Sequence, residues 1–127
     1  HKARFLHDLS YDIVHRFGGR VPDTKKELES LAGVGKKTAN VVYAVAFGGQ
    51  AIAVDTHVFR VSNRLGITDS KNVETSQKQL EEAIPPELWS KSHHWLLLFG
   101  RYVCKSQNPN CGSCYVRQYC KYINKGV

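Results

Sequence analysis

Residues 31–42 of the chain read LAGVGKKTANVV, and two closely spaced glycines in this stretch decide how the chain turns. Gly33 and Gly35 end one predicted helix and open another, which we expect from about Lys36 to Phe47. Glycines adopt positive φ readily and leave neighbouring backbone N–H groups uncovered. A phosphate can accept from such groups at the positive end of a helix dipole. The stretch therefore predicts a phosphate-binding glycine hairpin; the alternative is a plain corner between two helices.

The rest of the chain also reads as helices. Apolar residues recur with helical spacing, capping residues precede several of these runs, and glycines or prolines follow them. No strand pattern of any length occurs, so the predicted fold class is all-α. The last expected helix is apolar on most sides, and we expect it to be well buried. The further expected helices cover about residues 5–17, 24–31, 55–65, 72–84 and 87–104.

Composition and charge narrow the class of partner. The chain has 127 residues, a formal net charge of +7 and a pI near 9.4. A basic domain of about this size favours a polyanion, either nucleic acid or an anionic membrane surface, with simple solubility as the alternative. No apolar run approaches the length of a membrane span, and no signal-peptide pattern opens the chain. The chain begins with His1 and contains no Met, which we interpret as an excised or truncated N-terminus.

The four cysteines form one cluster in the sequence, spaced C-x6-C-x2-C-x5-C, and no other cysteine occurs. Disulfides would need an oxidising compartment, and nothing here indicates secretion. Zinc sites usually use two C-x2-4-C pairs, whereas only one x2 pair is present. A 4Fe–4S cluster takes four thiolates from a wider cage, often from one loop. The spacing favours iron–sulfur and leaves zinc and structural thiols open. The candidate metal ligands are Cys104, Cys111, Cys114 and Cys120.

Lys37 and Asp55 are the candidates for chemistry. A lysine becomes a nucleophile only after losing its proton, which the neighbouring charge of Lys36 and partial burial would favour. Its free amine could then attack the anomeric carbon of a deoxyribose. Asp55 follows an apolar link and opens a helix, where a carboxylate could transfer protons or stabilise a cationic sugar. The alternatives are a solvated lysine and an aspartate that only caps its helix.

Several of these motifs together resemble one family. Residues 31–42 resemble the helix–hairpin–helix of the endonuclease III family of DNA glycosylases. Residues 52–60, IAVDTHVFR, look like the segment that carries the family's essential aspartate. Residues 93–102, HHWLLLFGRY, are similar to the segment leading into its cluster. The cysteine spacing matches the family's 4Fe–4S loop, so the resemblance covers essentially the whole chain, in order, with four separate motifs.

The resemblance implies a fold and a cofactor. The implied fold is the helix–hairpin–helix DNA glycosylase fold, with part of a six-helix barrel and a C-terminal 4Fe–4S loop. The implied domains are residues 1–66, a partial barrel with its hairpin at about 31–39, and residues 67–127, a cluster domain. The cluster loop would span residues 104–120, and its four cysteines would be the ligands.

The resemblance also implies base-excision repair of double-stranded DNA that carries a damaged base or an abasic site. Such an enzyme removes oxidised pyrimidines from a flipped-out nucleotide and cleaves the abasic site by β-elimination. Lys37 matches the family's Schiff-base lysine and Asp55 its catalytic aspartate. The implied protein is an intracellular monomer, in the cytoplasm or nucleoid if bacterial. The alternatives are a non-catalytic DNA-binding iron–sulfur module, an inactive fragment and an electron-transfer protein. The expected DNA contacts are Gly33, Val34, Gly35, Lys36, Thr38, Arg101 and Lys105.

The chain departs from the family pattern in three respects. Ala32 stands where the family typically has proline, and the loop 105–110, KSQNPN, has one lysine where relatives often carry more. The family's N-terminal segment, which completes the barrel, is missing. We therefore interpret the chain as the C-terminal portion of a longer enzyme, with exposed apolar residues on its first helix. The affected residues would be Phe5, Leu9 and Ile13, and Arg101, Arg117 and Lys121 could replace the missing loop lysines.

Overall fold

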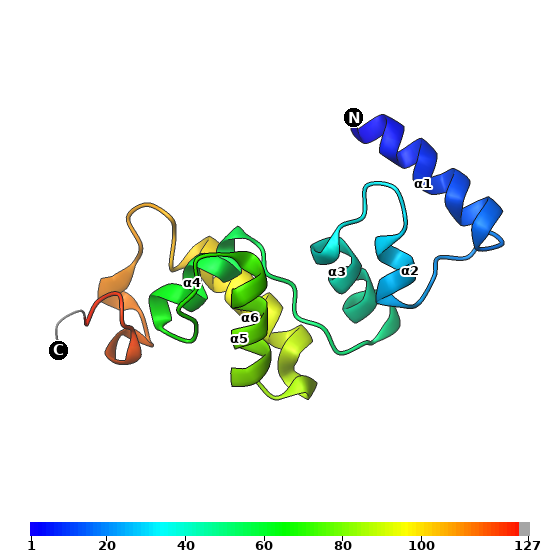
Figure 1. Cartoon of the computed structure of the whole chain (residues 1–127). Helices are drawn as coiled ribbons and strands as arrows, with labels where there is room; N and C mark the ends of the chain where they lie inside the picture. Colours follow the sequence, from blue (N-terminus) through cyan, green and yellow to red (C-terminus); the bar gives the residue numbers. More distant parts are fainter. Residues whose placement is uncertain (125–127) are drawn as a thin grey trace. The chain divides into compact units, whose positions relative to one another are not determined.

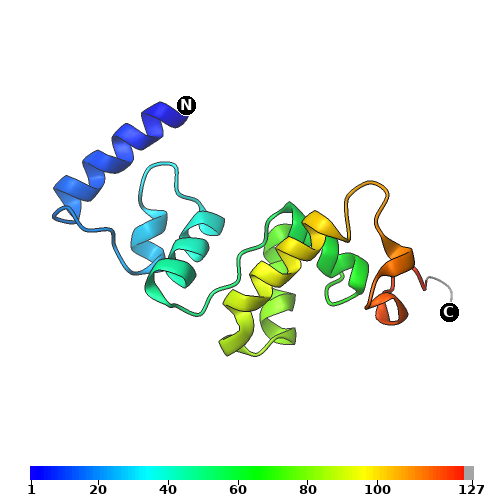
Figure 2. The same ribbon diagram turned by 180° about the vertical axis from the view of Figure 1, so that it is seen from behind.

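The computed structural model describes residues 1–124, and within them the chain is helical, without a strand (Figures 1 and 2). This confirms the predicted all-α class. No helix in the described part is long and apolar enough to cross a membrane. The α-helices are α1 (Lys2–Arg16), α2 (Lys25–Glu29), α3 (Lys36–Phe47), α4 (Thr56–Leu65), α5 (Val73–Ala83) and α6 (Trp89–Tyr102), and the 3-10 turns are η1 (Pro86–Leu88), η2 (Cys111–Ser113) and η3 (Arg117–Tyr119).

The chain forms two compact units, and it passes from the first to the second between Ala53 and Val54. The first unit holds α1, α2 and α3. The second holds α4, α5, α6 and the segment that carries the cysteines. The domain boundary after residue 66, which the family resemblance implies, stays a prediction.

The first unit is built on a small apolar core. Leu28, Leu31 and Ala39, from α2 and α3 and the turn between them, are at most 5% exposed. Half-buried side chains of α1 pack against this core, among them Leu9 and Ile13. The expectation that Leu9 and Ile13 would be exposed is therefore wrong, because α1 turns this face towards α2 and α3. The other packing residues are Phe17, Val34, Val42 and Tyr43.

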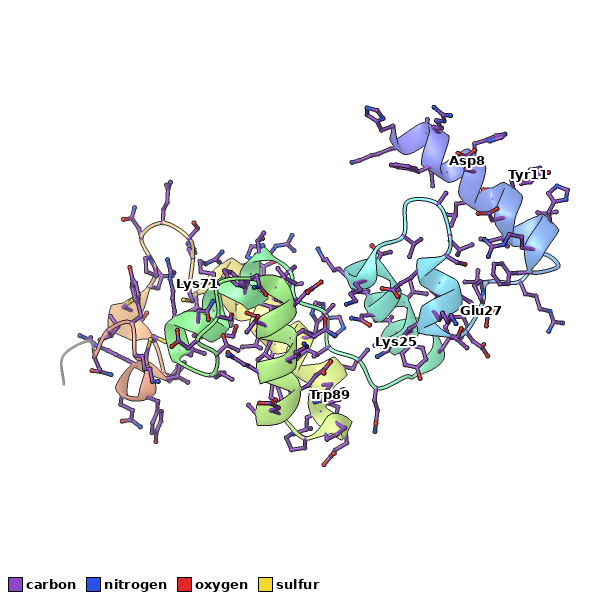
Figure 3. The ribbon with its side chains drawn as sticks, viewed as in Figure 1. Asp8, Tyr11, Lys25, Glu27, Lys71 and Trp89 are labelled. Atoms are coloured by element: carbon purple, nitrogen blue, oxygen red, sulfur yellow. The ribbon has the colours of Figure 1, made fainter. Side chains whose placement is uncertain are left out.

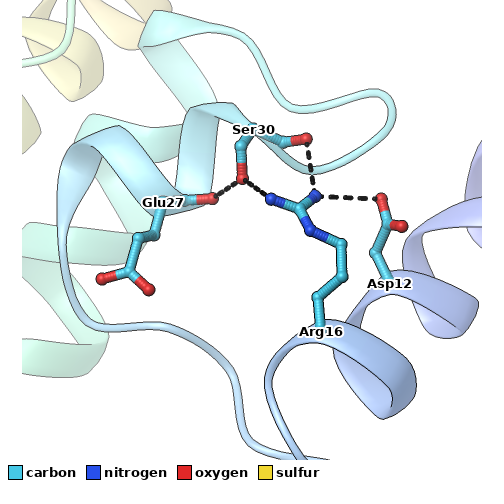
Figure 4. A network of polar contacts seen from close by, with 4 residues as sticks. All are labelled: Asp12, Arg16, Glu27 and Ser30. Atoms are coloured by element: carbon cyan, nitrogen blue, oxygen red, sulfur yellow. Dashed lines mark hydrogen bonds and ion pairs between the residues drawn. The ribbon is translucent and has the colours of Figure 1, made fainter.

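A polar network also ties α1 to the end of α2 (Figure 4). The Arg16 guanidinium donates to the Ser30 carbonyl at 3.4 Å and to Ser30 Oγ at 3.1 Å. It also pairs with Asp12, one turn earlier on α1, at 3.6 Å. Ser30 Oγ in turn donates to the Glu27 carbonyl at 2.6 Å. Since Ser30 directly follows α2, this network holds α1 beside the residues that lead into the glycine hairpin.

Thr24 caps the start of α2 with its side chain. Thr24 Oγ1 accepts from the Glu27 N–H at 3.2 Å and donates to Glu27 Oε1 at 2.9 Å. The next residue, Lys25, labelled in Figure 3, holds its ammonium 5.3 Å from the centre of the Tyr43 ring on α3. A cation over an aromatic face is attractive, so this contact joins α2 to α3.

The second unit is organised around the packing of α4 on α6. Val58 and Val61 of α4 and Leu80 of α5 are fully buried. A Cβ at Gly100 of α6 would lie 2.9 Å from Val61 Cγ2 and 3.1 Å from His57 Cβ, so only glycine allows this approach of α6 to α4. The two helices therefore meet at a position where one of them has no side chain.

The last α-helix starts later than the sequence predicts. The helix expected from Glu87 begins instead as the 3-10 turn η1, and α6 starts at Trp89. Trp89, labelled in Figure 3, donates its indole N–H to the Ile84 carbonyl at 2.8 Å. The expected burial of this helix is wrong, because Trp95 and Leu98 are 58% and 46% exposed. Its buried residues are Ser92, His93 and Gly100, and Leu96, Leu97 and Phe99 are half-buried.

Candidate nucleic-acid interface and metal centre

The glycine hairpin has the expected positive φ at Gly33 but not at Gly35, whose φ is −94°. Gly33 has φ of +76°, in the left-handed region that favours glycine, and Gly35 is the N-cap of α3. The N-cap of α3 makes no side-chain hydrogen bond to the first turn of that helix. Gly33, Gly35, Lys36 and Thr38 are exposed and Val34 is half-buried. This arrangement can bind an anion through backbone N–H groups, with Lys36 adding positive charge.

Phe5 of α1 lies directly against Gly33 of the hairpin. A Cβ at Gly33 would lie 2.9 Å from Phe5 Cβ and 3.0 Å from Phe5 Cγ. Phe5, Ala32, Gly33 and Thr38 line one shallow depression on this unit. Phe5 is nevertheless 48% exposed, as the sequence predicted for it. The hairpin therefore lies directly on α1, and it depends on the absence of a side chain at Gly33.

Lys37 occupies the first turn of α3, beside Lys36. Both side chains are exposed, so the partial burial expected for Lys37 is not found in the first unit. The physical reason is local: the apolar face of α3 that meets α2 carries Ala39 and Val42, and Lys37 lies off this face. The Lys37 side chain is thus reachable from solvent and follows the exposed glycines of the hairpin.

Asp55 is the N-cap of α4, in the second unit. Its Oδ1 accepts from the Val58 N–H at 2.7 Å, and the side chain is half-buried. This bond orients the carboxylate and engages one of its two oxygens, so the cap and a chemical role are compatible. Ile52 and Val54, which precede it, are at most 3% exposed. Asp55 therefore stands at the end of a buried segment that restricts its movement.

The four cysteines are free thiols that line one cavity of the second unit. Cys120 is buried and the other three are half-buried. The cavity wall is otherwise mostly apolar, with Leu65, Phe99, Val103, Pro109 and Ile123. Within residues 1–124, no three ligand-type side chains are grouped as a site for a single metal ion. The donor set is four soft sulfurs around one cavity, which fits the ligand requirement of an iron–sulfur cluster.

Two arginines of α4 contact the start of residues 104–120, which carry the four cysteines and are called the cysteine segment from here on. The sequence analysis did not identify either arginine. Arg60 donates to the Cys104 carbonyl at 3.1 Å and to the Gly100 carbonyl at 2.8 Å, which satisfies acceptors at the end of α6. Arg64 donates to the Lys105 carbonyl at 2.7 Å and lies 3.5 Å from Cys104 Sγ. Their spacing of four residues, which places both on one face of a helix, was the available signal.

The remaining predicted contacts are basic side chains around the cysteine segment. Arg101, Lys105, Arg117 and Lys121 are all exposed in the second unit. Arg101 is in the last turn of α6 and Lys105 directly follows Cys104. The predicted site residues thus fall into two groups: the hairpin and Lys37 in the first unit, and Asp55, the cysteines and these basic residues in the second.

Known proteins share the hairpin and nearly the whole of the chain. The family model "Helix-hairpin-helix motif" matches residues 16–45, which include the glycine hairpin. The endonuclease III of Haemophilus influenzae is 46% identical over 124 residues, which is 98% of this chain and 59% of the relative. The chain belongs to the endonuclease III family. It spans somewhat more than half the length of the curated relatives that it matches.

Solved structures of the endonuclease III family share the fold. A trapped endonuclease III–DNA covalent intermediate matches with a TM-score of 0.92 and 48% identity, over 98% of this chain and 59% of that one. A non-covalent endonuclease III–DNA complex matches with a TM-score of 0.93 and 47% identity, over 98% and 58%. Both of these relatives were therefore crystallised with DNA.

Proposed function

We propose that the chain is the part of an endonuclease III-type repair enzyme that removes a damaged pyrimidine from DNA and cleaves the abasic site. The observation that carries this proposal is the exposed glycine hairpin followed at once by Lys37. It is supported by the similarity of nearly the whole chain to an endonuclease III that was trapped covalently on DNA. The proposed partner is double-stranded DNA, which the chain would bind as a monomer.

Binding would begin at the phosphate backbone. The start of α3, which has no side-chain cap and carries the positive end of the helix dipole, suits one phosphate, and Lys36 adds charge there. In the second unit Arg101 and Lys105 offer further cations, exposed to solvent. Phosphate contacts of this kind make affinity fall steeply with salt, with a slope that reports their number. We therefore expect the logarithm of the binding constant to fall linearly with the logarithm of salt concentration.

Lys37 would carry the bond-making steps. Its neutral amine attacks C1′ of the flipped nucleotide, a C–N bond forms, and the glycosidic bond breaks as the base leaves with a proton. Opening of the sugar ring, with a proton taken up by O4′, gives a protonated imine between Lys37 and C1′. Loss of a proton from C2′ then expels the 3′ phosphate and nicks the strand. The exposed amine can reach a nucleotide that the duplex presents outside its stack.

Asp55 would act beside the sugar. One carboxylate oxygen is held by the Val58 N–H, and the group is thereby fixed in orientation. A carboxylate held in this way can stabilise the positive charge that develops at C1′, or accept a proton, without first reorganising.

The cysteines would hold a 4Fe–4S cluster. Cys104, Cys111, Cys114 and Cys120 would be its four ligands, and their common cavity and soft sulfur donors support this assignment. When bound, the cluster would organise the segment that carries Lys105 and Arg117, so that these cations face the DNA backbone.

A second candidate function is a DNA-binding iron–sulfur module without catalysis. The exposure of Lys37 and the capping role of Asp55 favour it, because each residue then has an ordinary structural explanation. Both candidates bind DNA through the same cations and amides, so they differ only in chemistry.

Borohydride trapping on duplex DNA with one abasic site separates the two candidates. Borohydride reduces the imine to a stable amine, so the bifunctional enzyme gives a covalent protein–DNA adduct. Lys37→Gln should abolish the adduct while DNA binding persists. Lys36→Gln is the matched control, because it removes the same charge one residue earlier and should weaken binding but still give the adduct. DNA binding by the unaltered chain without any adduct would reject catalysis by this chain and leave the binding module.

A further inference from the structure

Arg64 contacts both ends of the cysteine segment, although its position on α4 lies far from that segment in the sequence. At the start of the segment its guanidinium donates to the carbonyls of Lys105 at 2.7 Å and Ser106 at 3.1 Å, and it lies 3.5 Å from Cys104 Sγ. A planar guanidinium can satisfy several acceptors in fixed directions at once. These contacts determine where the backbone leaves Cys104.

The end of the segment is held by the same residue. The Arg64 carbonyl accepts from the Tyr122 N–H at 2.9 Å and from Cys120 Sγ at 3.4 Å. The Arg64 guanidinium also lies over the Tyr122 ring, 4.7 Å from its centre. The first and last cysteines are thus both within hydrogen-bond reach of one residue. Arg64 itself is half-buried in the second unit, so its cation is partly shielded from solvent.

We propose that Arg64 is the positioning residue of the cluster: it closes the cysteine segment and supplies a positive charge at the Cys104 sulfur. This inference rests on the proposed cluster. A four-thiolate cluster has net negative charge, so a cation at one sulfur stabilises it and stabilises its reduced state most. Groups that orient metal ligands typically change metal affinity by about 10- to 100-fold when they are removed.

The test compares three variants of the whole chain by iron release to a chelator and by the reduction potential of the bound cluster. Arg64→Leu should lose iron about 10-fold faster or more than the unaltered chain. Its potential should also move to more negative values. Arg64→Lys keeps the charge but cannot reach three acceptors at once, so its potential should stay near that of the unaltered chain while iron release remains fast. Arg20→Leu removes an equal charge from an exposed position in the other unit and should change neither quantity.

Each outcome decides the proposal. Iron release and potential in Arg64→Leu equal to those of Arg20→Leu would overturn it. If circular dichroism shows that Arg64→Leu does not fold, iron release from Arg64→Lys decides: faster release supports the proposal and an unchanged rate overturns it. An unaltered chain that is folded but holds no iron would instead reject the cluster itself, which is a different result from an iron-bound chain that is indifferent to Arg64.

Discussion

Replacing Gly33 by alanine tests whether the hairpin depends on a residue without Cβ. At φ of +76° an L-residue costs about 1–2 kcal/mol. The new Cβ would also lie 2.9 Å from Phe5 Cβ and 3.0 Å from Phe5 Cγ, atoms close to the backbone that cannot swing aside. Such overpacking typically costs about 1–3 kcal/mol. We therefore expect the Gly33→Ala change to lower the stability of the first unit by about 2–5 kcal/mol.

Gly35→Ala is the matched control for this prediction. Gly35 has φ of −94° and nothing within 4 Å of a built Cβ, so alanine there should cost less than about 1 kcal/mol, through a poorer helix cap. Native-state hydrogen exchange of the α1, α2 and α3 amides measures the free energy of opening within this unit. Affinity for duplex DNA should fall more for Gly33→Ala than for Gly35→Ala. Equal losses of protection in the two variants would refute the reasoning, because only Gly33 combines positive φ with a close neighbour.

Three further changes have definite expected outcomes. Gly100→Ala should lower the stability of the second unit by about 1–3 kcal/mol, because its Cβ would lie 2.9 Å from Val61 Cγ2. This loss should outweigh the better helix propensity of alanine. Urea unfolding followed by tryptophan fluorescence measures the change, and a stabilised variant would contradict the prediction. Asp55→Asn should keep the helix cap and the melting temperature but lose the trapped adduct, whereas Asp55→Ala should lose both, at about 1 kcal/mol of stability. If Asp55→Asn forms the adduct at the same rate as the unaltered chain, the carboxylate serves only as the helix cap. Thr24→Ala removes the acceptor for the Glu27 N–H and should cost about 1 kcal/mol, measured by hydrogen exchange in α2. Unchanged exchange would show that this helix cap is not needed.

Local features of the fold were predictable because their causes lie within a few residues. The bounds of α3, the cap at Asp55 and the closing Gly66 follow from glycine conformation and from side-chain bonds that span three residues. Gly66 has φ of +90°, as a left-handed helix end requires. The family could be inferred for the same reason, since each of its motifs is a short continuous stretch of sequence.

Burial was harder to predict, because it depends on which face of a helix finds a partner. The sequence of α6 is apolar on most sides, yet its most buried residues are Ser92, His93 and Gly100, while Trp95 and Leu98 are exposed. The first helix shows the opposite case, since Leu9 and Ile13 find a core that the α2 and α3 residues provide. Lys37 likewise was expected to be partly buried and is exposed.

The sequence by itself determined the helices, their caps, the glycine hairpin and the set of four sulfur ligands, because propensity, φ preference and ligand chemistry are properties of single residues and short stretches. Only the tertiary structure showed that Arg60 and Arg64 contact Cys104, from 44 and 40 residues away. It also showed that Gly33 lies against Phe5. Contacts of this kind form only after α4 has packed on α6 and α1 has packed against the hairpin. They therefore depend on which apolar face of each helix is buried against which neighbour.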